Sequence, residues 1–294
     1  MTVTVPALKP MSLPSQNAPF VSRPEAGRGL LEFSFVAGGS AVTRAEATNP
    51  LKLLNPRRKN KAAWTYVSTF GGGLVAGDQT DIHVRVRSGA TGVISTQSST
   101  KVYKSPNGVP SRQFLSASLD ENATLVIAPD PVTCFADSVY QQYQRFDLAT
   151  DSTLIVIDWL TSGRRACGER WDFSRYASRL EVFLTGTRLL NESLCLNRDE
   201  GALEGLYRLG RFNCLATVLL IGQRLQMIRK QLLTLIGSKP IEPGALLIDA
   251  ISPIQDGVIL RILADTPESV SRYLKDKLSF LRDMLGEAPW ERKW

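Results

Sequence analysis

The stretch D-I-H-V-R-V-R at residues 81–87 alternates polar and apolar side chains without a break. A period of two places every second side chain on the same face, so the pattern predicts a β-strand with one buried face. Ile82, Val84 and Val86 then face a core, while His83 lies on the polar face and is solvated.

The same period recurs in short runs on both sides of this stretch. Gly, Asn, Asp and Pro cluster between the runs, as in N-G at residues 107–108 and P-D-P at residues 129–131. Further runs begin at Leu31, Leu125, Leu154 and Leu180. Many short strands separated by turn signals predict a mainly β body, either a sandwich or a solenoid.

Helical periodicity appears only towards the C-terminus. Leucine and isoleucine recur every three or four residues over 225–235, and Gly237 follows as a capping residue. A stronger pattern runs over 270–285, with Thr266 as its N-cap and Gly286 at its end. Two strands are predicted between these helices, at residues 245–250 and 257–263. The tail is therefore predicted as strand, helix, strand, strand, helix on the β body.

The first 28 residues carry five prolines and little apolar periodicity, which predicts a flexible leader. No linker signal follows, so residues 29–294 are predicted to form a single domain.

Composition narrows the function. Of 294 residues 43% are apolar and 21% charged, which is the balance of a globular protein. The single histidine excludes zinc sites built from two or three imidazoles. The net charge of +7 is spread along the chain without a basic stripe interleaved with aromatic residues, so we expect no nucleic-acid partner.

The cysteine pattern and the hydropathy indicate the cellular compartment of the protein. The four cysteines form no C-x-x-C pair and are too few to build a disulfide scaffold in a chain of this length, which favours a reducing compartment. They are Cys134, Cys167, Cys195 and Cys214. No apolar run reaches the roughly 18 residues needed to cross a bilayer. We therefore expect a cytoplasmic protein without a membrane partner.

A glycine cluster, F-G-G-G-L-V-A-G-D-Q at residues 70–79, leads into the strand quoted first. The spacing of Gly72 and Gly77 fits a P-loop, but Asp78 stands where a P-loop has its phosphate-binding lysine. A dinucleotide fingerprint would need a helix next, and a strand pattern follows instead. We therefore predict no nucleotide site and interpret the cluster as a backbone crossing that requires glycine, with Asp78 on a tight loop.

Two further polar motifs carry candidate site residues. The hydroxyl-rich stretch T-Q-S-S-T-K-V-Y-K-S at residues 96–105 either forms a solvated strand end or points Gln97 and Lys101 into an interior polar site. In S-G-R-R-A-C-G-E at residues 162–169, Glu169 stands among arginines on a glycine-flanked turn. That carboxylate is either part of a surface charge cluster or is held by arginines in a fixed pose.

These motifs, together with A-P-D-P at residues 128–131, occur in an order and at intervals that resemble the UreD (UreH) family of urease accessory proteins. The resemblance runs from residue 29 to near the C-terminus. It implies a mainly β, helical stack of many short strands, similar to a solenoid, with two C-terminal α-helices.

The resemblance also implies a function. The family is a non-enzymatic scaffold for urease maturation that joins apo-urease to a UreF-like accessory protein and a UreG-like GTPase. No cofactor is implied to be stably bound, and nickel in transit is implied to pass through a water-filled tunnel. By match of motif, Asp78 and Glu169 are carried over as the acidic residues near that path.

The same two carboxylates leave a second class of function open. Asp78 and Glu169 would suit the acid–base pair of a hydrolase if they faced one cleft about 5–10 Å apart. Oxygen ligands that are few and weak equally suit a nickel ion that must be released again. The scaffold is therefore the first hypothesis, the hydrolase is the alternative, and nucleic-acid binding ranks last.

Overall fold

The computed structural model describes residues 26–57 and 60–291. The predicted leader lies outside the described residues as far as residue 25. Strand β1 begins at Ala26, slightly before residue 29, because its first residues pair in parallel with the start of β5. The prediction of one domain over residues 29–294 stays a prediction.

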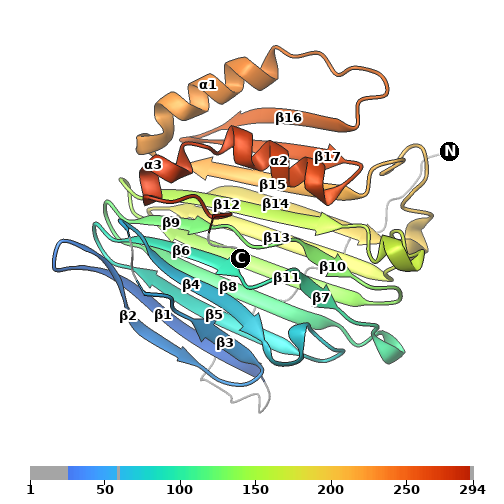
Figure 1. Ribbon diagram of the computed structural model, residues 1–294, viewed down its shortest axis with the longest axis horizontal. Coiled ribbons are helices and arrows are strands. Elements are labelled where there is room, and N and C mark those ends of the chain that lie inside the picture. Colours follow the sequence, from blue (N-terminus) through green and yellow to red (C-terminus); the bar gives the residue numbers. More distant parts are fainter. Residues whose placement is uncertain (1–25, 58–59, 292–294) are drawn as a thin grey trace.

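The strands form two sheets that enclose a common core (Figure 1). The seven-stranded sheet has the order β14-β13-β11-β8-β5-β1-β2. Its strands are β1 (Ala26–Val36), β2 (Gly39–Ala47), β5 (Gln79–Val86), β8 (Ser111–Leu119), β11 (Val139–Leu148), β13 (Arg175–Leu184) and β14 (Thr187–Asn197).

The ten-stranded sheet has the order β16-β17-β15-β12-β9-β6-β4-β3; β10 also pairs with β12, and β7 pairs with β10. Its strands are β3 (Leu51–Leu54), β4 (Ala63–Thr69), β6 (Thr91–Thr96), β7 (Thr100–Val102), β9 (Thr124–Ile127), β10 (Val132–Cys134), β12 (Thr153–Thr161), β15 (Cys214–Ile221), β16 (Leu247–Ile254) and β17 (Gly257–Ala264). Short 3-10 turns lie at Phe70–Gly72 (η1), Pro106–Gly108 (η2), Arg165–Cys167 (η3), Arg198–Glu200 (η4) and Gln223–Leu225 (η5).

The path of the chain is that of a coil. It passes from β5 to β6, from β8 to β9 and from β11 to β12, so that each circuit adds one strand to each sheet, parallel to the one before. Antiparallel pairs, β1 with β2 and β13 with β14, finish the two ends of the seven-stranded sheet. Repeated circuits that contact only their neighbours define a solenoid-like stack. The predicted mainly β, solenoid-like class is confirmed.

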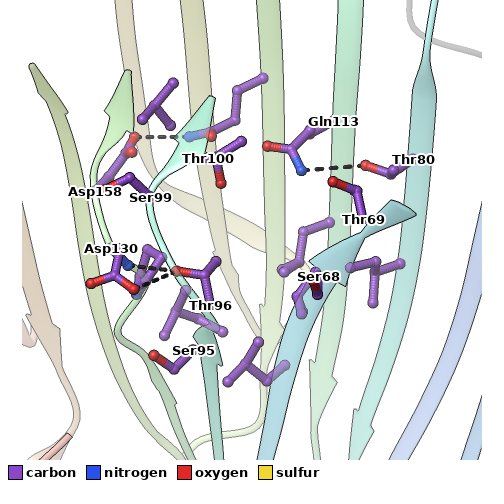
Figure 2. A pocket seen from close by; sticks show the side chains of 18 of the residues that line it. Ser68, Thr69, Thr80, Ser95, Thr96, Ser99, Thr100, Gln113, Asp130 and Asp158 are labelled. Atoms are coloured by element: carbon purple, nitrogen blue, oxygen red, sulfur yellow. Dashed lines mark hydrogen bonds between the residues drawn. The ribbon is translucent and has the colours of Figure 1, made fainter. Parts of the chain in front are cut away.

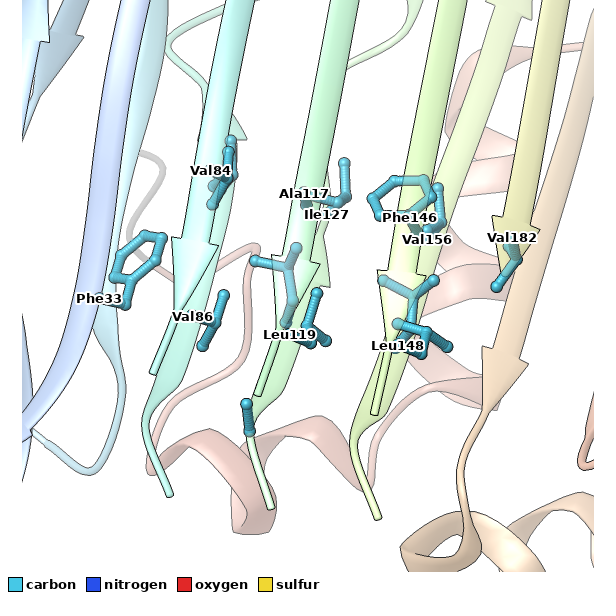
Figure 3. Close-up of a cluster of buried hydrophobic side chains, with 14 of the residues drawn as sticks. Phe33, Val84, Val86, Ala117, Leu119, Ile127, Phe146, Leu148, Val156 and Val182 are labelled. Carbon is cyan, nitrogen blue, oxygen red and sulfur yellow. The ribbon is translucent and has the colours of Figure 1, made fainter. Parts of the chain in front are cut away.

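The core between the sheets follows from the alternation read in the sequence. Ile82, Val84 and Val86 are at most 4% exposed, whereas His83 lies on the outer face with its side chain half exposed. Figure 3 shows Val84 and Val86 beside Phe33, with equivalent buried residues on the neighbouring strands. Each such side chain contributes about 1.5–3 kcal/mol by leaving water.

Three helices cover the outer face of the ten-stranded sheet near its C-terminal strands (Figure 1). They are α1 (Gln226–Gly237), α2 (Pro267–Lys277) and α3 (Leu281–Leu285). The Thr266 side chain accepts a hydrogen bond from the Ser269 amide, and Gly286 ends α3 at a φ of 86°, as predicted. The helix predicted over 270–285 is instead divided into α2 and α3, because Leu278 leaves the helical conformation at φ −107°, ψ 24°. Within residues 26–57 and 60–291, no helix has the length and apolarity of a bilayer span.

The two ends of the stack differ. At one end, three four-residue turns of the same form, at 87–90, 120–123 and 149–152, join the sheets. At the other end, long loops at 70–78, 97–110 and 162–174 carry the motifs singled out in the sequence. A second apolar cluster lies beneath these long loops and includes Leu74, Val102, Cys134, Tyr140 and Trp171.

Candidate functional site

The sequence motifs meet at the end of the stack that carries the long loops. Leu74 donates its amide hydrogen to Lys101 O at 2.8 Å, and Leu74 O accepts from Tyr103 N at 2.9 Å. These two bonds join the glycine motif to the hydroxyl-rich motif. Thr96 Oγ1 in turn accepts from the Asp130 amide at 2.7 Å, which joins the hydroxyl-rich motif to A-P-D-P.

The glycine motif makes a tight crossing, as predicted. Gly71, Gly72 and Gly77 have φ values of 82°, 70° and 89°, in the left-handed region that favours glycine. At Gly73 the reason is contact instead, because a Cβ there would lie 2.6 Å from a ring carbon of Tyr103. The motif therefore holds its loop against the neighbouring one.

Asp78 and Glu169 hold loops in place. Asp78 Oδ2 accepts from the Val75 amide at 2.9 Å and so closes its own turn. Glu169 receives two hydrogen bonds from the Arg164 guanidinium and a third, of 3.2 Å, from the Ala136 amide. Arg164 holds the pKa of Glu169 below its ordinary value.

The fixed-pose interpretation of Glu169 fits these contacts. Neither Asp78 nor Glu169 lines either of the two interior cavities described below. Their assignment to a nickel path stays a prediction.

The interior placement predicted for Gln97 and Lys101 is wrong, because both residues are exposed. Their neighbours Thr96, Ser99 and Thr100 line the interior instead. The motif does contribute to a polar interior, but through its hydroxyl groups.

A layer of polar side chains crosses the space between the two sheets. On the seven-stranded sheet the register pairs Thr80 with Gln113, Gln113 with Gln142 and Gln142 with Ser178. On the ten-stranded sheet it pairs Asp158 with Thr217 and Thr217 with Arg261. We call these two facing rows the polar layer; its residues are Thr80, Gln113, Gln142, Ser178, Asp158, Thr217 and Arg261.

The polar layer separates two apolar clusters. On β13, Leu180 and Val182 belong to the core beside the short turns, whereas Tyr176 belongs to the cluster beneath the long loops, and Ser178 lies between them. On β12, Val156 and Leu160 flank Asp158 in the same way. The polar layer therefore lies between these two apolar clusters on both sheets.

Asp158 is the centre of this layer. Its Oδ2 accepts from Gln142 Nε2 at 2.9 Å and from Ser178 Oγ at 3.2 Å, so both sheets contribute. Gln142 Oε1 lies 3.0 Å from the Tyr140 hydroxyl, which extends the network towards Gln113. Burial raises the pKa of Asp158 above its ordinary value, and these hydrogen bonds oppose the shift.

Two cavities of about 120 Å³ each lie along the layer, and Asp158 lines both of them. Figure 2 shows the first, with serine and threonine side chains and Asp158 around it. The second lies towards β14 and β17 and is lined by Ser178, Thr217 and Arg261. Each cavity has room for several water molecules.

The polar groups of the lining are mainly oxygen ligands. Hydroxyls, amides and the carboxylates of Asp130, Asp158 and Glu192 line the cavities together with Arg261 and apolar side chains, and no cysteine or histidine lines either one. Within the described part of the chain, no three His, Cys, Asp or Glu side chains gather as a metal-binding group. Such a layer can hold water and can bind a cation weakly, which suits a cation in transit better than one that is stably bound.

Sequence reasoning missed Asp158. The signal was one carboxylate inside the apolar run L-I-V-I-D-W-L at residues 154–160. Alternation alone places it on the same face as Leu154 and Val156, which is a buried face. A buried carboxylate calls for a partner or a function.

Comparison with known proteins places the chain in a family. The family model described as "UreD urease accessory protein" matches residues 25–294. The chain is 42% identical over 293 residues to a protein named "Urease accessory protein UreD" from Sorangium cellulosum, covering 99% of this chain and 92% of the relative.

Two more distant relatives agree with that match. A protein of the same name from an Anaeromyxobacter species is 38% identical, with 92% of each chain covered. "Urease accessory protein D" of Arabidopsis thaliana is 35% identical over 87% of this chain and 96% of the relative. The chain therefore belongs to the UreD family of urease accessory proteins.

Proposed function

We propose that this protein serves urease maturation as a scaffold that joins apo-urease to a UreF-like accessory protein and a UreG-like GTPase, and that nickel reaches urease through the polar layer. The accessory role in urease maturation is supported by the family. The partners and the route of nickel are the proposal.

The observation that carries the proposal is the carboxylate of Asp158, which is partly buried between two cavities. Taking a carboxylate out of water is costly, and apolar side chains of similar volume would stabilise the interior at least as well. Within residues 26–57 and 60–291, no cationic side chain forms an ion pair with Asp158. A carboxylate between two cavities, without a cationic partner among the described residues, is what a divalent cation in transit requires.

The lining also accounts for release. Nickel binds imidazole and thiolate ligands tightly, and the cavities offer neither. Hydroxyl and amide oxygens bind such an ion weakly, so it can leave again. The polar layer therefore suits a path better than a store.

The hydrolase alternative gains nothing from the structure. A general acid needs a raised pKa, but Arg164 lowers the pKa of Glu169. Both oxygens of Glu169 are already occupied by hydrogen bonds.

The test of the path is Asp158→Asn in a reconstituted mixture of apo-urease, the UreF-like protein, the UreG-like GTPase, GTP and nickel. Asparagine keeps the shape of the side chain and can still accept from Gln142, but it carries no charge. Nickel per urease active site should fall while the complex still forms. The matched control is Asp147→Asn, because Asp147 is a carboxylate on the outer face of β11, paired with Arg145.

The scaffold is tested separately by pull-down with the purified partners. Wild type and Asp158→Asn should both retain apo-urease and the UreF-like protein. If neither partner is retained by the wild-type chain, the scaffold is refuted; if both are retained and Asp158→Asn loads nickel fully, only the path is refuted.

A further inference from the structure

One ion pair joins the two sheets across the end of the polar layer. The Arg261 Nε donates to Glu192 Oε1 at 3.2 Å and its Nη2 donates to Glu192 Oε2 at 2.7 Å. Glu192 lies on β14 and Arg261 on β17, so the pair bridges the seven-stranded and the ten-stranded sheet. Two parallel hydrogen bonds hold the guanidinium and the carboxylate in one plane.

This pair stands where the second cavity reaches the surface. The cavity is lined by Asp158, Thr217, Glu192 and Arg261. Asp158 is partly buried between the sheets, whereas the Glu192 and Arg261 side chains are 28% and 44% exposed. β14 is the edge strand of its sheet and β17 is next to an edge, and among the described residues no backbone pairing joins these two strands. Side chains close it instead.

Two other pairs of the same geometry show that this position is unusual. Arg44 with Glu46 and Arg145 with Asp147 also make two hydrogen bonds each, but each pair lies along a single strand. Neither pair crosses between sheets or lines the first or second cavity. Of these three pairs, Arg261–Glu192 is the one that joins the two sheets and lines a cavity.

We propose that Arg261 is a gating residue: its guanidinium occupies Glu192 as a tethered counter-cation and so closes this end of the polar layer to divalent cations. The inference rests on the proposed function, because it assumes that the layer is a cation path. A guanidinium and a divalent cation compete for the same carboxylate oxygens. While Arg261 holds Glu192, its positive charge also repels a cation at the opening.

The proposal also indicates how this end of the polar layer would open. A carboxylate from a docked protein could take the guanidinium, because Arg261 is nearly half exposed on its outer side. Glu192 would then face the cavity together with Asp158, and a cation could pass. Arg261 thus acts through Glu192 and is a positioning residue for the path.

The test uses the isolated full-length chain and nickel chloride, measured by isothermal titration calorimetry. Arg261→Gln keeps most of the length of the side chain and removes its charge, and it should raise nickel affinity about tenfold. Arg261→Lys keeps the charge and should bind nickel as weakly as wild type. Arg44→Gln is the matched control, because it opens a pair of equal geometry elsewhere.

Each result of the titrations either supports or overturns the gating role of Arg261. A gain in Arg261→Gln that disappears in the double variant Glu192→Gln/Arg261→Gln supports the gate. An unchanged affinity in a folded Arg261→Gln variant, or an equal gain in Arg261→Lys or in Arg44→Gln, overturns it. Melting curves show whether each variant is folded, and nickel loading of urease by Asp158→Asn tests the path itself independently of this result.

Discussion

The polar layer should be replaceable by apolar side chains without loss of the fold. Gln142→Leu alone removes a 2.9 Å hydrogen bond to a buried carboxylate and a contact with the Tyr140 hydroxyl. Bonds to charged groups contribute about 1.5–3 kcal/mol, so we expect a loss of about 2–3 kcal/mol in the free energy of unfolding. For a chain of this size that is a fall of about 3–5 °C in Tm.

The double variant Gln142→Leu/Asp158→Leu should be more stable than Gln142→Leu alone. It removes the carboxylate together with its partner and places two apolar side chains beside an existing cavity. Replacing a whole buried polar pair is often neutral, whereas breaking it is costly. A thermodynamic cycle from urea unfolding of wild type, both single variants and the double variant should give a coupling of about 1–2 kcal/mol. Additive losses would refute this reasoning, because they would show that the two residues stabilise the fold independently.

Three further results are expected. Because burial raises the pKa of Asp158, the stability it contributes is present below its unfolded pKa and is lost as pH rises through its folded pKa. The Tm of Asp158→Asn minus that of wild type should therefore grow as pH rises above about 4, and a difference that stays constant would contradict this. Gly73→Ala should lower the free energy of unfolding by about 1–3 kcal/mol, because the added methyl group would overpack against the Tyr103 ring. Gly72→Ala should cost less, about 1 kcal/mol, because that position has open space and only its left-handed φ disfavours alanine. Chemical denaturation that ranks the two variants in the opposite order would contradict the contact at Gly73. A thiol reagent should label Cys167, which is exposed, and spare Cys134, because burial raises the pKa of that thiol to about 12; mass spectrometry that finds Cys134 labelled in the folded protein would contradict its burial.

The fold could be predicted largely because alternation survives in the sequence wherever one face of a strand is buried. The run at residues 81–87 shows this directly, and the continuous apolar run at 154–157 fits a strand buried on both faces by core and helices. The break between α2 and α3 could not be predicted, since the apolar spacing continues across Leu278.

The site was harder to predict, because it depends on register. Thr80, Gln113, Gln142 and Ser178 are single polar residues in four different strands, and only the pairing of those strands brings them into one row. The motifs left open whether Glu169 belongs to a surface charge cluster or is held by arginines, and its contacts fit the second interpretation. They do not show which face of the hydroxyl-rich stretch points inward, and the interior alternative for Gln97 is wrong.

The most direct test of the path is the nickel content of urease matured with Gln142→Leu/Asp158→Leu as the only copy of this chain. This variant is expected to fold and to keep the outer surfaces that partners would contact, since Gln142 is buried and Asp158 contacts it between the two sheets. The account predicts that the complex forms and that nickel per urease active site falls to the level of a mixture lacking this chain. Full nickel loading by the folded double variant would contradict the claim that nickel passes through the polar layer.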